Sequence, residues 1–106
     1  MTLRPPSRYA NIGTGTGTGS GPLGVLDHEL AGEKAAALGR AGERAEKALA
    51  LLRAASEAER SDLTNAAARA VHAYFIQREL CGLRRHHDVI REYDIPATVL
   101  ARLGAS

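Results

Sequence analysis

The side chains best suited to nucleophilic or metal chemistry lie near the C-terminus: Cys81, His86 and His87, with His72 upstream. A zinc site usually has four ligands at closer spacings, and adjacent residues on a helix point about 100° apart. A cysteine nucleophile needs an activating neighbour and an oxyanion site, and the sequence supplies no such set. We therefore expect no catalytic residue, metal or cofactor, and keep a small metal- or thiol-dependent enzyme at Cys81 and His86 as an alternative.

A second candidate set consists of basic side chains that could contact an anion or a nucleic acid: Arg84, Arg85, His86, Arg91 and Arg102. The whole chain carries 14 Lys and Arg against 12 Asp and Glu, a net charge of +2, and the signs alternate. Proteins that bind phosphates normally cluster their cations. We therefore hold a nucleic-acid-associated regulator as an alternative. We expect the charged side chains at the end of the second helix to form ion pairs that hold the short C-terminal helices in place, namely Arg78, Glu79, Arg84, Arg85 and Asp88.

The composition divides the chain into two regions. Residues 1–21 contain a Gly/Thr tract with nothing to bury, so we predict a disordered tail there and one helical domain over residues 22–106. The G-x-G-x-x-G pattern at Gly19, Gly21 and Gly24 lacks the strand and βαβ unit that phosphate binding requires. No secretory signal or membrane-spanning stretch is recognisable, and Cys81 is the only cysteine, which favours a reducing, cytoplasmic compartment.

A long first helix is predicted from Leu23 to Ala55, entered through Pro22. Apolar residues recur there at steps of three and four, interrupted by Glu33. The members of this stripe are Leu26, Leu30, Ala37, Ala41, Ala45, Ala48, Leu52 and Ala55. Gly39 and Gly42 indicate either a break in this helix or the close approach of another backbone to it.

A second helix is predicted after a tight reversal. Ser56 and Glu59 have the spacing of a capping box, with Ser61 and Asp62 as a competing cap, and Gly82 is the expected stop after Cys81. We expect a short helix over Arg84–Tyr93, a break at Pro96, and a last turn that ends at Gly104. The inward side chains expected from these two short segments are Leu83, Val89, Ile90, Tyr93, Val99, Leu100 and Leu103. The predicted fold is an all-α antiparallel hairpin with two short helices over one end.

Several segments are similar in sequence to one protein family. The runs Val71–Ile90, Tyr93–Pro96 and Val99–Gly104, with the block Gly32–Gly42, resemble a family of small proteobacterial proteins that has no assigned activity. The resemblance covers residues 23–104. It implies a shared fold, and it carries no catalytic residue to this chain.

The composition predicts a core that is short of large side chains, because 20 of the 106 residues are Ala and only 4% are aromatic. Small domains often compensate for a small core by associating. We therefore predict a non-enzymatic interaction or scaffold protein that forms a homo-oligomer, with an antiparallel dimer favoured and another protein partner possible. The candidate interaction residues are Leu26, Leu30, Ala37, Ala41, Ala45, Leu52, Tyr74 and Phe75.

Overall fold

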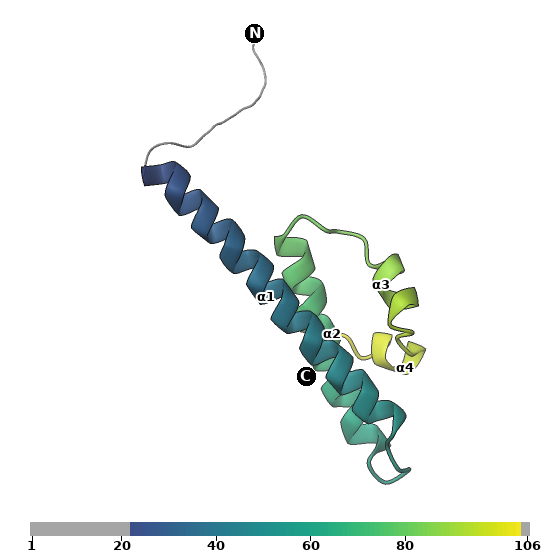
Figure 1. Ribbon diagram of the computed structural model, residues 1–106. Coiled ribbons are helices and arrows are strands. Elements are labelled where there is room, and N and C mark those ends of the chain that lie inside the picture. The colour runs from purple at the N-terminus through teal and green to yellow at the C-terminus, as the bar shows by residue number, and fades with distance from the viewer. Residues whose placement is uncertain (1–21, 105–106) are drawn as a thin grey trace. The chain divides into compact units, whose positions relative to one another are not determined.

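The computed structural model describes residues 22–104, with side chains from Val25 onward. This range contains four helices, α1 (Pro22–Arg53), α2 (Arg60–Leu80), α3 (His87–Glu92) and α4 (Ala97–Leu100), and no strand. Figure 1 shows α1 and α2 joined by a tight turn, with the chain then returning through α3 and α4. The all-α class and the hairpin with short C-terminal helices are confirmed.

The chain divides into two units between Glu33 and Lys34. In the first unit the structure describes α1 from Pro22 to Glu33, and all its described side chains, from Val25 onward, are exposed. The second unit contains the hydrophobic core, with the rest of α1 and all of α2, α3 and α4. The predicted tail, residues 1–21, lies outside the described residues.

The core draws on α1, α2 and the C-terminal segment. Its three largest fully buried side chains are Leu49 of α1, Val71 of α2 and Val99 of α4. The rest of the core comprises Ala41, Ala45, Leu52, Ala67, Ala68, Tyr74, Phe75, Val89 and Ile95. The C-terminal segment therefore covers part of the hairpin with the chain's own residues. Leu49 is absent from the predicted stripe, although it lies four residues after Ala45 and three before Leu52.

Helix α1 is continuous from Pro22 to Arg53, so of the two alternatives for Gly39 and Gly42 the break is excluded. Gly39 has open space where a Cβ would stand, whereas a Cβ on Gly42 would lie 3.3 Å from Cε1 of Tyr74. Neither glycine has another backbone against it, so the structure does not bear out a backbone approach here; the neighbour of Gly42 is the ring of Tyr74.

The start of α2 differs from the prediction, and its end agrees with it. The backbone N–H of Ser56 donates to Oε1 of Glu59 over 3.1 Å, but this half of the capping box precedes a helix that begins only at Arg60. At the other end Gly82 has a φ of +88°. The N–H of Leu83 donates to the Arg78 carbonyl, a Schellman arrangement that confirms Gly82 as the stop.

Helix α3 begins at His87, three residues later than Arg84, where it was predicted. Leu83 therefore lies outside the helix and is 43% exposed, against the prediction, whereas Val89 is buried as expected. The chain leaves α3 at Asp94, whose φ of 49° lies in the left-handed region. The break at Pro96 is confirmed, as is the end of the last turn at Gly104, which has a φ of +75°.

Two alanine substitutions in α1 test the packing at Gly42. Ala is favoured over Gly inside a helix by about 1 kcal/mol, and Gly39 has room for the methyl group. We expect Gly39→Ala to raise the free energy of unfolding by about 0.5–1 kcal/mol. Gly42→Ala should gain clearly less or lose stability, because Tyr74 must move. Urea unfolding followed by circular dichroism measures both, and an equal gain in the two variants would contradict the contact.

Candidate functional site

The most connected polar group lies where the chain leaves α2, around the ring of His86. This ring stacks on Phe75 with centroids 4.1 Å apart and planes inclined by 3°. Nε of Arg78 donates to Nδ1 of His86 over 3.1 Å, and Nε2 of His86 lies 3.0 Å from Oε2 of Glu79. Because Nδ1 accepts, the proton of a neutral ring belongs on Nε2, from where it is donated to the carboxylate.

Arg78 links this network to the backbone of the loop after α2. Its Nη2 donates to the Arg85 carbonyl over 2.9 Å, and its guanidinium lies 5.8 Å from the centre of the Tyr74 ring. Hydrogen bonds of Arg78, Glu79 and His86 thus hold residues 83–86 against α2. The predicted ion-pair network differs, because the Arg84 and Arg85 side chains are exposed and do not join it. Asp88 joins only Arg91, over 3.1 Å, and both side chains are at least 80% exposed. Such a surface pair contributes little to stability.

The side chains considered for metal or thiol chemistry have other partners. Both ring nitrogens of His86 are occupied by Arg78 and Glu79. Sγ of Cys81 lies 3.8 Å from the Lys34 carbonyl. Across residues 22–104, no three His, Cys, Asp or Glu side chains are grouped so that they could hold a metal ion. The structure therefore does not assemble a site from Cys81, His86 and His72.

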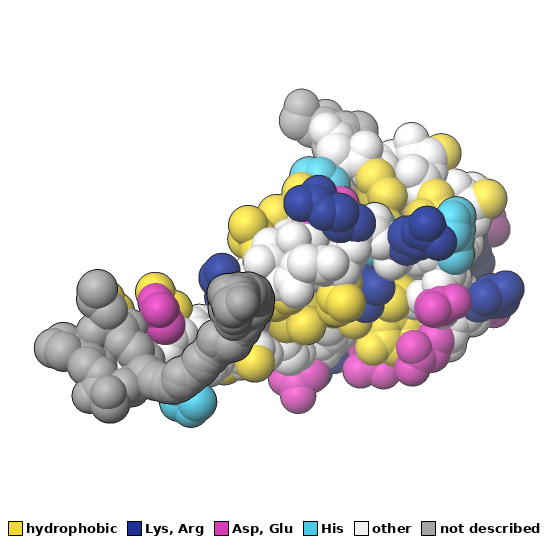
Figure 2. Space-filling view, turned by 90° about the horizontal axis from the view of Figure 1, so that it is seen from above, with side chains coloured by type: hydrophobic (Ala, Val, Ile, Leu, Met, Phe, Trp, Pro, Cys, Tyr) yellow, Lys and Arg dark blue, Asp and Glu magenta, His cyan; other side chains and the backbone are white. Residues whose placement is uncertain are grey.

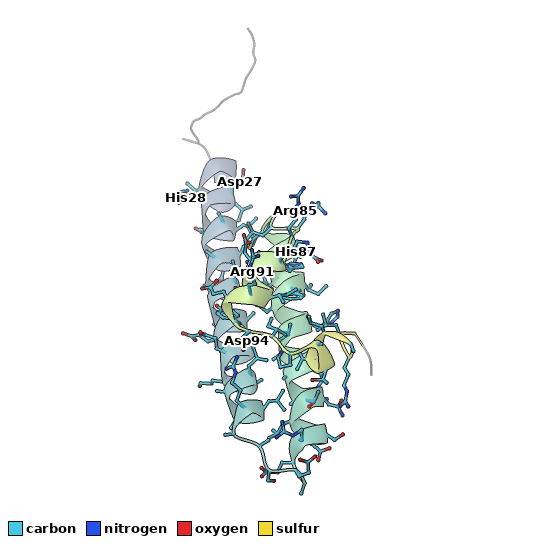
Figure 3. The ribbon with its side chains drawn as sticks, turned by 90° about the vertical axis from the view of Figure 1, so that its right-hand side faces the viewer. Asp27, His28, Arg85, His87, Arg91 and Asp94 are labelled. Carbon is cyan, nitrogen blue, oxygen red and sulfur yellow. The ribbon has the colours of Figure 1, made fainter. Side chains whose placement is uncertain are left out.

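The candidate nucleic-acid residues are not gathered on one element. Arg84 and Arg85 are exposed on the loop, and Figure 3 shows Arg85, His87 and Arg91 along the loop and α3. Arg102 instead turns to α2, where its Nη1 donates to Oδ1 of Asn65 over 2.8 Å. The helix before it, α4, has only four residues. On the face in Figure 2, Lys and Arg side chains are separated by hydrophobic and uncharged atoms.

Five of the eight candidate interaction residues belong to the core of this chain. They are Ala41, Ala45, Leu52, Tyr74 and Phe75, each at most 8% exposed. They are not available on the surface, because α1, α2 and the C-terminal segment cover one another here. Ala37 is half-buried, whereas Leu26 and Leu30 are 50% and 51% exposed. Val25, 54% exposed, adds to them and was missed because it lies off the predicted stripe.

A second exposed apolar group surrounds the end of α2. Ile76, Leu80 and Leu83 are 44%, 60% and 43% exposed. The sequence indicates that the run from Val71 to Ile76 needs cover on several sides. Val71, Tyr74 and Phe75 receive that cover, and Ile76 does not.

Two tyrosines connect α2 to the end of α3. The rings of Tyr74 and Tyr93 have centroids 6.1 Å apart, and Arg53 donates to the Tyr93 carbonyl. Burial raises the pKa of Tyr93 to about 12, with smaller contributions from Tyr74 and from the carboxylates of Glu46 and Glu92. The phenol therefore stays protonated to a higher pH in the folded chain than in the unfolded chain.

Comparison with known proteins assigns the chain to a family. The model of a family described only as a family of unknown function, DUF6665, matches residues 15–106. No curated protein and no solved structure matches the chain. In the range that the structure describes, no helix has the length and apolar character needed to cross a lipid bilayer.

Adjacent histidines provide a matched test of the network. His86→Ala removes the stack on Phe75 and leaves Arg78 and Glu79 without their partner, so we expect a loss of about 2 kcal/mol in the free energy of unfolding. His87→Ala changes an exposed side chain and should stay within about 0.5 kcal/mol of the parent. Urea unfolding measures the two variants, and equal losses would show that the network contributes nothing specific.

The raised pKa of Tyr93 predicts a loss of stability in alkaline solution. Between the ordinary tyrosine pKa of 10 and about 12, the unfolded chain releases the phenolic proton while the folded chain retains it. The free energy of unfolding therefore falls as pH rises through this window, and Tyr93 has no such effect below it. Tyr93→Phe should make the fall shallower. Urea titrations from pH 9 to 12 measure this, and equal pH slopes in both proteins would refute it.

Proposed function

The chain belongs to DUF6665, a family of unknown function, and we propose that it is a non-enzymatic interaction module that associates with a second copy of itself. The first part of α1 is the proposed contact surface. The observation that carries the proposal is the exposure of Val25, Leu26 and Leu30, each at least half accessible to solvent. These three side chains are not part of the hydrophobic core, so they are free to contact a second copy.

The spacing of these residues supports a helix–helix contact. Leu26 and Leu30 are four residues apart, so they lie on one face of the helix. The described side chains of α1 from Val25 to Glu33 are all exposed, and residues 22–33 of the helix contain Gly24 and Gly32, so packing and helix propensity support this segment weakly. Pairing with a second copy would stabilise the segment by burying its leucines.

The size of the apolar group sets the expected strength. Burying the exposed half of a Val or Leu side chain contributes about 1 kcal/mol, so six such side chains in a symmetric pair contribute about 6 kcal/mol before the cost of association. Association itself costs about 4 kcal/mol or more, so little net free energy remains, and we expect a weak dimer that forms only at high protein concentration.

The charges of the same segment give the dimer a distinctive salt dependence. Asp27, Glu29 and Glu33 are the acidic side chains of this segment, and it contains no Lys or Arg. Two copies therefore repel each other through their carboxylates, and added salt should tighten the dimer by screening them. Binding to a nucleic acid would weaken with salt.

The proposal includes the setting in which the protein works. We place it in the cytoplasm of a proteobacterium, as the lone, half-buried Cys81 and the resemblance of residues 23–104 suggest. No catalytic group is part of the proposal. This part of the proposal is supported by the hydrogen bonds that the polar side chains around His86 make with one another.

Sedimentation velocity at several protein concentrations tests the dimer. We expect the parent chain to shift toward a dimer as concentration rises, and the double variant Leu26→Gln/Leu30→Gln to remain monomeric over the same concentrations. Gln keeps the helix propensity close to that of Leu while removing the apolar surface.

Leu51→Gln is the matched control, because Leu51 is also on α1 and is 59% exposed. It should dimerise like the parent. Leu80→Gln reports on the second apolar group. A monomeric parent at all concentrations, or a dimer abolished by Leu80→Gln and not by the double variant, would overturn the proposed surface.

A further inference from the structure

A hollow of about 390 Å³ lies where the end of α1, the start of α2 and the C-terminal segment meet. All of its lining belongs to the unit that contains the core. Its polar lining includes Arg53, Glu57, Arg60, Ser61, Thr98 and Arg102. Its volume falls within the range of small-molecule sites. The lining includes one residue of each predicted set, Arg102 of the nucleic-acid set and Leu52 of the interaction set.

The lining is strongly biased toward positive charge. It contains three arginines and one acidic residue, Glu57. The arginines come from three different segments: Arg53 ends α1, Arg60 begins α2 and Arg102 follows α4. Folding therefore brings together cations that the sequence separates.

Hydrogen bonds to the protein backbone orient these arginines. Nη1 of Arg102 donates to the Ser61 carbonyl over 3.3 Å and to Asn65 over 2.8 Å. Nη2 of Arg60 donates to the Ala55 carbonyl over 3.4 Å, and its Nε lies 4.0 Å from Oε1 of Glu57. Each guanidinium has five N–H groups, so donors remain beyond those that these contacts use.

The polar groups beside the arginines also favour an anion. Arg60 and Ser61 belong to the first turn of α2, where no side chain caps the helix. Backbone N–H groups of a first turn carry a partial positive charge. The hydroxyl of Thr64 is already used, since it donates to the Arg60 carbonyl over 2.6 Å. Ser61 and Thr98 bring further hydroxyl groups to the lining.

We propose that this hollow binds a small oxyanion of the phosphate type, as inorganic phosphate or as the phosphate group of a small molecule. Arginine suits this role, because its planar fork matches the oxygens of a phosphate. Arg60 and Arg102 provide the main contacts. Ser61 and Thr98 donate to the remaining oxygens.

A neighbouring hollow of about 450 Å³ limits the size of the ligand. It shares Arg53 with the first hollow, but its other charged residues are Glu46, Glu92 and Asp94. These carboxylates offset the charge of Arg53 and would repel a long polyanion. The site therefore favours a single small oxyanion over a nucleic-acid backbone.

Nuclear magnetic resonance titration with inorganic phosphate tests the site, with sodium chloride added to hold the ionic strength constant. We expect saturable shifts at the backbone amides of Ser61 and Thr98, with a dissociation constant of about 1–10 mM. Arg60→Gln and Arg102→Gln should each weaken binding about tenfold. Glu57→Gln should tighten binding, because it removes the acidic residue of the lining. The expected gain is only about twofold, because 95% of that side chain is exposed and water screens its charge.

Arg69→Gln is the matched control, since Arg69 is exposed on α2 and lies outside the lining. It should bind phosphate like the parent. If the Arg102→Gln variant does not fold, Thr98→Asp provides a second test. It adds a negative charge to the lining and leaves the hydrogen bond of Arg102 to Asn65 in place, and it should also weaken binding about tenfold. Chemical shifts that never saturate would overturn the site, as would an equal loss of phosphate affinity in Arg69→Gln. The absence of any shift with both inorganic phosphate and a small phosphate monoester would overturn it as well.

Discussion

The shortage of large side chains between α1 and α2 is the constraint on which this structure depends. Ala41 and Ala45 of α1, with Ala67 and Ala68 of α2, are core residues that contribute little apolar area. The larger buried groups near them include residues of the C-terminal segment, which supplies Val89, Ile95 and Val99 to the core. The hairpin is therefore completed by residues that follow it in the chain.

The polar network explains how that segment is held. The Schellman turn at Gly82 reverses the chain, and Arg78 and Glu79 of α2 then hold His86 on the face of Phe75. Arg102 provides another attachment through Asn65. With the core completed in this way, the exposed Leu26 and Leu30 carry the proposal of a second copy as partner.

Much of the backbone is predictable from sequence because it follows from local rules. Pro22, Gly82 and Pro96 mark boundaries that depend on their own conformational limits. The start of α3 depends instead on Arg78, which hydrogen-bonds to Arg85 and His86 before the helix begins, and no local rule reveals that contact. For the same reason spacing could not separate stripe residues that end in the core, such as Ala45, from those that stay exposed, such as Leu26. That outcome depends on where the C-terminal segment packs.

Native-state hydrogen exchange at low and high protein concentration tests this account most directly. The account predicts that amides near Leu49, Val71 and Val99 exchange with similar free energies of opening at both concentrations, because they share one core. It predicts that amides from Val25 to Glu33 exchange fast in dilute solution and slow as the concentration rises. Opening of the segment around Val99 while Leu49 and Val71 remain protected would contradict the shared core.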